Sequence, residues 1–165
     1  MDLTTHQICQ AFVAEFVNQR TSADRAITQA PVAGMAQALG TTPEDNSILV
    51  LMKHTAWALT FRLRTILGDS ITEVITRDQS LTLREEDNIE SVGRLWNDAW
   101  DNVTKLLELE NLAEEVDVRG KMVSKLQVLV AMSNHISGHV GQIILLAKHF
   151  AGDKWTAVTV AKAQS

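Results

Sequence analysis

Apolar residues recur every three or four positions along most of this chain, with polar residues between them. Four long stretches show this spacing, at about 3–30, 47–67, 88–110 and 121–150. The spacing matches the turn of an α-helix and places the apolar side chains on one face. Four long amphipathic helices joined by loops of mixed length predict an all-α fold, the antiparallel four-helix bundle.

Local signals mark where these helices begin and end. Pro31 ends or kinks the first helix, because the residue before a proline is pushed out of the α region. Asn46 or Ser47 is expected to cap the second helix, and Gly68 to stop it. The fourth helix is closed by Ala151-Gly152.

The remaining residues are predicted as connections and a tail. Residues 31–46 form a connection with one helical turn around 33–39, and residues 69–87 form a loop that is locally helical at 71–75. Within 111–120, Val116 and Val118 alternate with charged residues, which predicts a short extended piece before Gly120.

Composition narrows the class of protein. A chain of 165 residues is the size of one domain, so residues 1–165 are treated as a single domain. Its 8 Gly and 2 Pro are about half the usual share, which favours long helices over turn-rich sheets. The net charge of −5 argues against nucleic acid as a partner, since that binding needs clustered Lys and Arg.

Three features of the chain bear on where it works. A single Cys, Cys9, allows no disulfide within the chain and fits a reducing cytoplasm. The first residues are polar and lack the apolar run of a signal peptide. No stretch approaches the ~20 apolar residues of a membrane span. We therefore expect a soluble cytoplasmic protein without a membrane partner.

The candidate chemistry lies in the fourth predicted helix. His135 and His139 are four residues apart and project from one face, so their imidazoles can share a metal ion. The same spacing also occurs by chance on many helices. Gly138 and Gly141 are unfavourable inside a helix, which predicts that a neighbouring helix or a ligand approaches this surface closely.

A metal site needs a further ligand, and His54 on the apolar half of the second helix is the best candidate. A histidine in that position is more often an ordinary core residue. His6 and His149 are expected on the surface.

Other reactive or aromatic groups are given structural interpretations. Residues 85–87, two glutamates and an aspartate, are interpreted as a solvated acidic run or as charges at a helix N-terminus. Trp96 and Trp100 are expected to pack in the core or at an interface. Cys9 has no basic neighbour in the sequence, so it is not expected to be a catalytic thiol.

Two motifs together resemble the DinB/YfiT-like metalloenzyme superfamily. The first is His135-x-x-x-His139-Val140-Gly141-Gln142-Ile143, and the second is Ser47-Ile48 followed by Val50-Leu51-Met52-Lys53-His54. The stretch from Leu145 to His149, the tail with Trp155, and the segments Arg77-Asp78 and Leu95-Trp96 to Trp100 resemble an uncharacterised bacterial branch of it, a domain of unknown function.

The resemblance implies a four-helix bundle that binds a divalent metal ion through His54, His135 and His139. Three neutral imidazoles suit Zn, Ni or Fe(II). Gln142 would contact the same cleft as a support for a ligand or as a substrate contact, and a hydrogen bond between helices is an equal alternative for it. A homodimer is also implied.

Two functions follow, and the sequence leaves both open. The first is a metal-dependent enzyme acting on a small molecule, either by hydrolysis or by transfer of a low-molecular-weight thiol, which is the reaction the resemblance favours. The second is a metal-binding or stress-related dimer in which the metal is structural and no catalysis occurs. A third option is that the three histidines bind nothing.

Overall fold

The computed structural model describes residues 4–42, 46–69 and 75–158. This part of the chain is mainly helical, with one small antiparallel sheet. The α-helices are α1 (Thr5–Ile27), α2 (Ile48–Leu67), α3 (Arg77–Ser80), α4 (Ile89–Asp101) and α5 (Lys125–Ala151). The 3₁₀ helices are η1 (Val32–Gly34), η2 (Asn102–Glu108) and η3 (Gly152–Lys154), and the strands are β1 (Glu115–Val118) and β2 (Lys121–Ser124).

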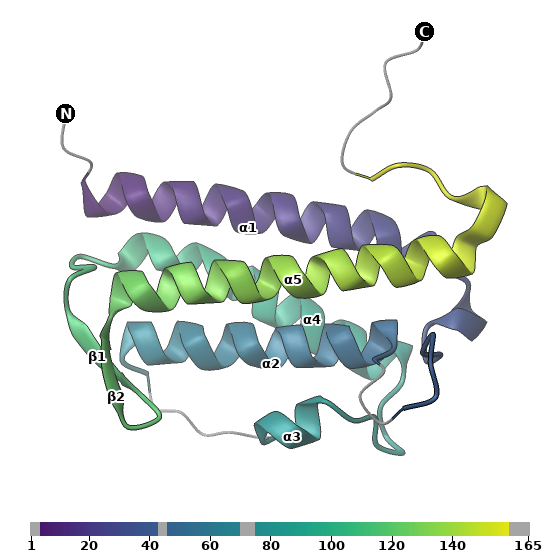
Figure 1. Ribbon diagram of the computed structural model, residues 1–165. Coiled ribbons are helices and arrows are strands. Elements are labelled where there is room, and N and C mark those ends of the chain that lie inside the picture. The colour runs from purple at the N-terminus through teal and green to yellow at the C-terminus, as the bar shows by residue number, and fades with distance from the viewer. Residues whose placement is uncertain (1–3, 43–45, 70–74, 159–165) are drawn as a thin grey trace, which may run out of the picture.

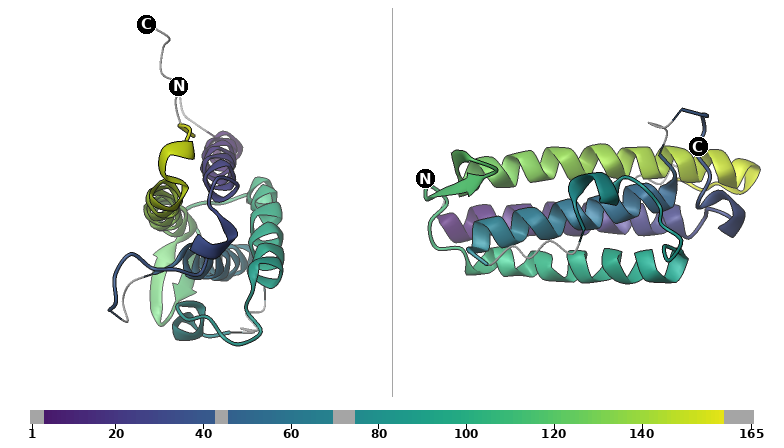
Figure 2. Two further views of the ribbon diagram at one scale, coloured as in Figure 1. Left: turned by 90° about the vertical axis from the view of Figure 1, so that its right-hand side faces the viewer. Right: turned by 90° about the horizontal axis from the view of Figure 1, so that it is seen from below.

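The four long helices lie side by side (Figures 1 and 2). Helices α1 and α5 run in one direction, and α2 and α4 run in the other (Figure 1). Helix α2 contacts both α4 and α5, while α1 packs against α5 and η2. The hairpin β1–β2 lies at the end of the molecule where α5 begins (Figure 1). As a result, α2 is enclosed by its neighbours, and most of its residues are buried.

Side-chain caps explain why the helices begin where they do. Ser47 accepts a hydrogen bond from the backbone N–H of Val50 and so caps α2, and Gly68 ends that helix in the left-handed conformation, with φ 76°. The predicted second helix is thereby confirmed. The first predicted helix is also confirmed over the described residues, since α1 runs from Thr5 to Ile27.

The start of the fourth predicted helix, at Lys121, is wrong. Residues 121–124 form strand β2, which pairs with β1 so that Val123 lies opposite Val116. A capping box between Ser124 and Gln127 then starts α5 at Lys125. The extended piece predicted at Val116 and Val118 is confirmed as β1.

Two further boundaries differ from the prediction. The third helix is α-helical only to Asp101 and continues as the 3₁₀ helix η2 to Glu108. A short helix, α3, was not predicted and is capped by a box between Thr76 and Gln79. The helical stretch predicted at 71–75 falls largely outside the described residues.

The prediction that a neighbouring helix approaches Gly138 and Gly141 closely is wrong for the described residues, and the alternative of a ligand stays a prediction. Both are exposed on α5, and a Cβ atom placed at either would meet nothing within 4 Å. The close approach occurs instead at Gly34 in η1, where a Cβ atom would lie 2.8 Å from Cγ of Phe150. The small residue therefore matters where η1 packs against the end of α5.

One helix bears on the expectation about membranes. By length and composition, α5 together with η3 (Lys125–Lys154) could cross a membrane, although no such stretch was expected from the sequence. Core helices of soluble proteins meet the same criterion. Helix α5 supplies interior residues such as Ile136 and Ile143, both fully buried, so a soluble protein is compatible with its composition.

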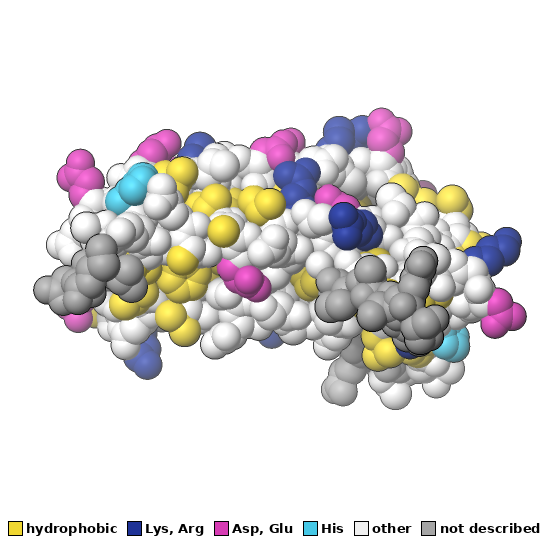
Figure 3. Space-filling model, turned by 90° about the horizontal axis from the view of Figure 1, so that it is seen from above, with side chains coloured by type: hydrophobic (Ala, Val, Ile, Leu, Met, Phe, Trp, Pro, Cys, Tyr) yellow, Lys and Arg dark blue, Asp and Glu magenta, His cyan; other side chains and the backbone are white. Residues whose placement is uncertain are grey.

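The face seen from above α1 carries interspersed acidic, basic and apolar side chains, with histidines near its two ends (Figure 3). His6 and His149 are both exposed, as predicted. Exposed apolar residues on the long helices include Val17 on α1 and Leu145 on α5.

Candidate metal centre

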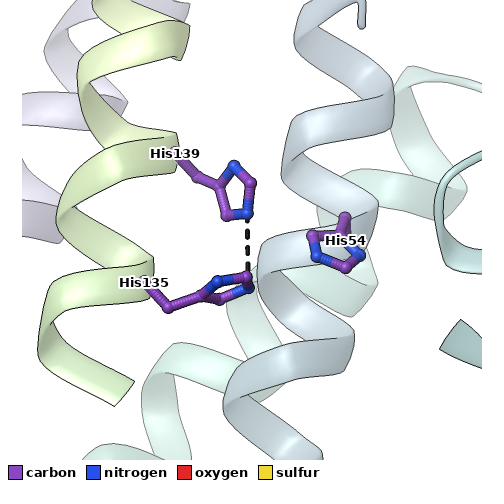
Figure 4. A group of neighbouring side chains, drawn as sticks. All are labelled: His54, His135 and His139. Carbon is purple, nitrogen blue, oxygen red and sulfur yellow. Dashed lines mark hydrogen bonds between the residues drawn. The ribbon is translucent and has the colours of Figure 1, made fainter. Parts of the chain in front are cut away.

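Three histidines from two antiparallel helices meet in the interior between α2 and α5 (Figure 4). His54 comes from α2, and His135 and His139 lie one turn apart on the facing side of α5. One ring nitrogen of each lies within 4.8 Å of the others. The ring centroid of His54 is 5.3 Å from that of His135 and 5.0 Å from that of His139. The predicted residues are therefore close enough together to bind one metal ion.

Burial keeps these imidazoles neutral. His54 is 3% exposed, and His135 and His139 are half-buried. Burial is the main cause that lowers the pKa of His54 to about 4, with repulsion from His139, Arg77 and Arg62 adding to it. Burial and then Arg62 likewise lower the pKa of His135 to about 4. At neutral pH both rings carry a free lone pair, which is the form that binds a metal.

Ser80 fixes which nitrogen of His54 is free. The Ser80 hydroxyl donates to the backbone carbonyl of Arg77 at 2.5 Å, so its hydrogen is already used. Its oxygen lies 2.8 Å from Nδ1 of His54 and must act as the acceptor, which makes Nδ1 the protonated nitrogen. The lone pair of His54 is therefore on Nε2.

Gln142 does the same for His139. Its carbonyl oxygen Oε1 lies 2.9 Å from Nδ1 of His139 and can only accept, so Nδ1 carries the proton and Nε2 the lone pair. Nε2 of His139 faces Nε2 of His135 at 3.2 Å (Figure 4). Burial is the main cause that lowers the pKa of His139, and repulsion from Arg62 adds to it, although the contact with Gln142 acts to raise it.

This donor set fits a divalent metal ion. Metal-bound histidines nearly always donate their second ring N–H to an acceptor, which fixes the ring and its tautomer. Ser80 and Gln142 supply such acceptors for His54 and His139. In the described part of the chain no carboxylate or thiol joins the three histidines.

A pocket of about 100 Å³ lies beside the histidines. Its floor includes His54 and His135, and an aromatic wall is formed by Trp57 and Phe61, whose rings are 5.5 Å apart. The indole of Trp57 also stacks on His54 at 5.6 Å and donates to the carbonyl of Ile75 at 3.1 Å. The pocket is also lined by Val118 and Arg119 of the hairpin.

The acidic run at residues 85–87 is not simply solvated, so that interpretation is wrong for Asp87. The side chain of Asp87 is 8% exposed and pairs at 2.5 Å with the ammonium of Lys53, which is 2% exposed. Lys53 also donates to the carbonyl of Thr82 at 2.9 Å, and Asp87 accepts from the backbone N–H of Arg84 at 2.8 Å. A lysine among apolar residues one position before His54 was the available signal.

The remaining candidates have the predicted structural places. Trp96 and Trp100 are buried, with ring centroids 5.3 Å apart, and the indole N–H of Trp96 donates to Asp24. Cys9 is fully buried in the core, and burial raises the pKa of its thiol, which makes it unreactive.

Comparison with known proteins yields a family but no function. The model of a family described as "Protein of unknown function (DUF1572)" matches residues 4–164. No curated protein and no solved structure matches the chain.

Proposed function

We propose that this chain, which belongs to the family of unknown function DUF1572, is a metal-dependent enzyme. In this proposal His54, His135 and His139 hold one divalent ion, Zn, Ni or Fe(II). The supporting observation is the arrangement of tautomers: Ser80 and Gln142 accept from Nδ1 of two of these histidines and leave their Nε2 lone pairs free.

We also propose the architecture and setting that the sequence resemblance implies. The four long helices would form a four-helix bundle of the DinB/YfiT-like kind, in a cytoplasmic protein that works as a homodimer. The parallel pairs α1 with α5 and α2 with α4 support a bundle with a long return connection between α2 and α4.

The proposed chemistry is hydrolysis or transfer of a low-molecular-weight thiol to a small electrophile. A divalent ion supplies either a hydroxide from water near pH 7 or a stabilised thiolate. The side chains of this protein position the metal ligands and shape the pocket. Ser80 and Gln142 hold the imidazoles in position, and the aromatic wall of Trp57 and Phe61 limits the access of water on one side of the pocket.

Metal content tests the site directly. Elemental analysis of purified protein is expected to give about one divalent ion per chain, and His135→Ala is expected to lose it. His149→Ala is the matched control, because His149 is exposed at the end of the same helix. Equal metal content in wild type and His135→Ala would refute the site.

Ser80→Ala tests the role of the hydrogen bond to His54. Loss of a group that orients a metal-bound histidine typically weakens metal binding about 10- to 100-fold. Calorimetric titration with Zn²⁺ is expected to show a loss of that size, while the metal remains detectable at high concentration. An unchanged affinity would mean that Ser80 does not set the tautomer of His54.

Turnover separates the enzyme from a structural metal protein. Metal-loaded protein is assayed with a panel of small thiols and an electrophilic probe, and with hydrolysable esters. Turnover that is lost in His135→Ala supports the enzyme. A stoichiometric metal without turnover on either panel supports the metal-binding dimer instead.

A further inference from the structure

Three arginines from separate segments converge on the pocket beside the histidines. Arg62 comes from α2, two turns after His54, while Arg77 begins α3 and Arg119 lies at the tip of the hairpin. No acidic side chain lines this pocket among the residues that the structure describes. We refer to Arg62, Arg77 and Arg119 as the arginine cluster.

Arg62 has unused hydrogen-bonding capacity. Its Nη1 atom is buried, and within the described residues it has no hydrogen-bond partner. Burial and then repulsion from Arg119 lower the pKa of its guanidinium. A buried donor without a partner is unfavourable, so a ligand oxygen at this point would stabilise the pocket.

Arg119 is held over the pocket by an unusual backbone conformation. Arg119 and Gly120 are the two residues of the hairpin turn, with φ of 57° and 83°, the pattern of a type I′ turn. A positive φ is uncommon for a residue other than glycine, asparagine or aspartate. The guanidinium carbon of Arg119 lies 5.4 Å from the ring centroid of Trp57 and 5.0 Å from that of Phe61, which fixes the cation against the aromatic wall.

The third arginine is only weakly neutralised. Arg77 contacts Asp78 at 3.6 Å, but both side chains are largely exposed, at 55% and 92%. Such an exposed pair is weak and leaves Arg77 able to bind another anion.

We propose that the arginine cluster binds the carboxylate or phosphate group of an anionic substrate next to the metal site. Planar guanidinium groups bind such oxyanions through paired N–H donors. A pocket of about 100 Å³ has room for a group of this size, since about 10–15 Å³ of cavity volume on this measure holds one water molecule. The inference rests on the proposed function for the identity of the ligand as a substrate, but anion binding itself does not require the metal.

Anion binding can be measured on metal-free protein. Calorimetric titrations of the full chain, treated with a chelator, use benzoate, inorganic phosphate and benzamide. Benzamide has the shape of benzoate without its charge. We expect wild type to bind benzoate or phosphate and not benzamide. Equal binding of benzoate and benzamide, or binding of none of the three, would overturn the proposal.

Substitutions then assign the binding to the cluster. Arg119→Gln is expected to weaken binding of the anion about tenfold or more, because one charge-assisted hydrogen bond is lost. It lies at an exposed hairpin tip, so the fold is retained. Arg62→Gln is the second test. Arg25→Gln removes the same charge from an exposed position at the end of α1 and is expected to bind like wild type.

Metal content of the same variants, measured before the chelator treatment, separates the two proposals. If Arg119→Gln keeps its metal and loses the anion, both proposals are supported. If wild type binds the anion through the cluster but holds no metal, the anion site stands and the proposed function fails. If the metal is present and Arg119→Gln and Arg62→Gln bind the anion like wild type, the arginine cluster is refuted and the metal site stands.

Discussion

Replacing Asp87 by asparagine would leave the Lys53 ammonium buried without its charged partner. The asparagine side chain would keep the size of the aspartate and an oxygen acceptor for the N–H of Arg84, so the change is mainly one of charge. Lys53 is 2% exposed and cannot reach water, and the Thr82 carbonyl would remain as its other acceptor. Asp87→Asn therefore isolates the contribution of the ion pair.

The expected loss of stability is large because the pair is buried. Breaking a buried pair by removing one partner typically costs about 3–5 kcal/mol. The remaining contact of Lys53 with Thr82 places the expectation at the lower end, about 3 kcal/mol. For a domain of this size that corresponds to a fall in melting temperature of roughly 6–12 °C. Removing both charges, with Lys53→Met added, should recover part of the loss, since no buried charge is then left unpaired.

Low pH should remove the contribution of the same ion pair to stability. Burial raises the pKa of Asp87, but the hydrogen bonds from Lys53 and from the backbone of Arg84 outweigh it, so the pKa is lowered overall. A carboxylate with a lowered pKa stabilises the fold above its ordinary pKa and loses this contribution as the pH falls through the lowered value. Asp87→Asn should therefore weaken the dependence of stability on pH below about pH 4.

Urea denaturation followed by circular dichroism measures both effects. Glu86→Gln is the matched control, since Glu86 is the neighbouring acid and its pair with Arg84 at 3.5 Å is exposed. We expect the control to change stability by less than about 1 kcal/mol. A cost below about 1 kcal/mol for Asp87→Asn would refute the argument that the buried pair of Asp87 with Lys53 contributes strongly to stability.

Two further predictions concern the helices and the histidines. Gly138→Ala should stabilise the protein by about 0.5–1 kcal/mol, because the position is open and helical. Gly34→Ala should destabilise it by about 1–3 kcal/mol, because the added methyl group would press on Phe150. Urea midpoints of the two variants that shift in the same direction would contradict this. The metal-free protein should lose stability between pH 7 and pH 5, roughly 2 kcal/mol for each of His54 and His135. The reason is that His54 and His135 have pKa values of about 4 in the folded state and near 6.5 in the unfolded state, so the unfolded state takes up protons first as the pH falls. A urea midpoint that does not change with pH, or that changes equally in His54→Gln, would contradict the argument that burial lowers these pKa values.

The regular helices could be predicted because their signals are local. Ser47 and Gly68 bound α2 through hydrogen bonds and a backbone conformation within a few residues, and the apolar period fills the helix between them. The same kind of signal was available for α5, where Ser124 and Gln127 form a capping box. The apolar spacing at residues 121–124 nevertheless favoured a helix start at Lys121, because a short strand and a helix end have similar patterns over four residues.

Tertiary contacts explain what the sequence did not predict. Asp87 looks like part of an acidic surface run until Lys53, 34 positions earlier, is placed beside it. The glycines of α5 showed the opposite problem, since an unfavourable residue in a helix implies a reason for its presence but does not locate one. For the candidate metal site, the spacing of His135 and His139 placed two ligands on one face. His54 was a candidate from its place on the apolar half of its helix, and the resemblance added it to the set. Ser80, Arg62 and Arg119 could not be assigned, because only the fold brings them to the site.

The three histidines also differ in when folding brings them together. His135 and His139 are positioned as soon as the middle turns of α5 form, a local event on a timescale of about a microsecond or less. His54 lies far earlier in the chain and joins them only when α2 docks on α5, a long-range contact of the kind that slows folding. A ligand that needs all three nitrogens would therefore bind only after docking, and its binding rate during refolding would report the docking of α2 on α5 rather than the formation of either helix.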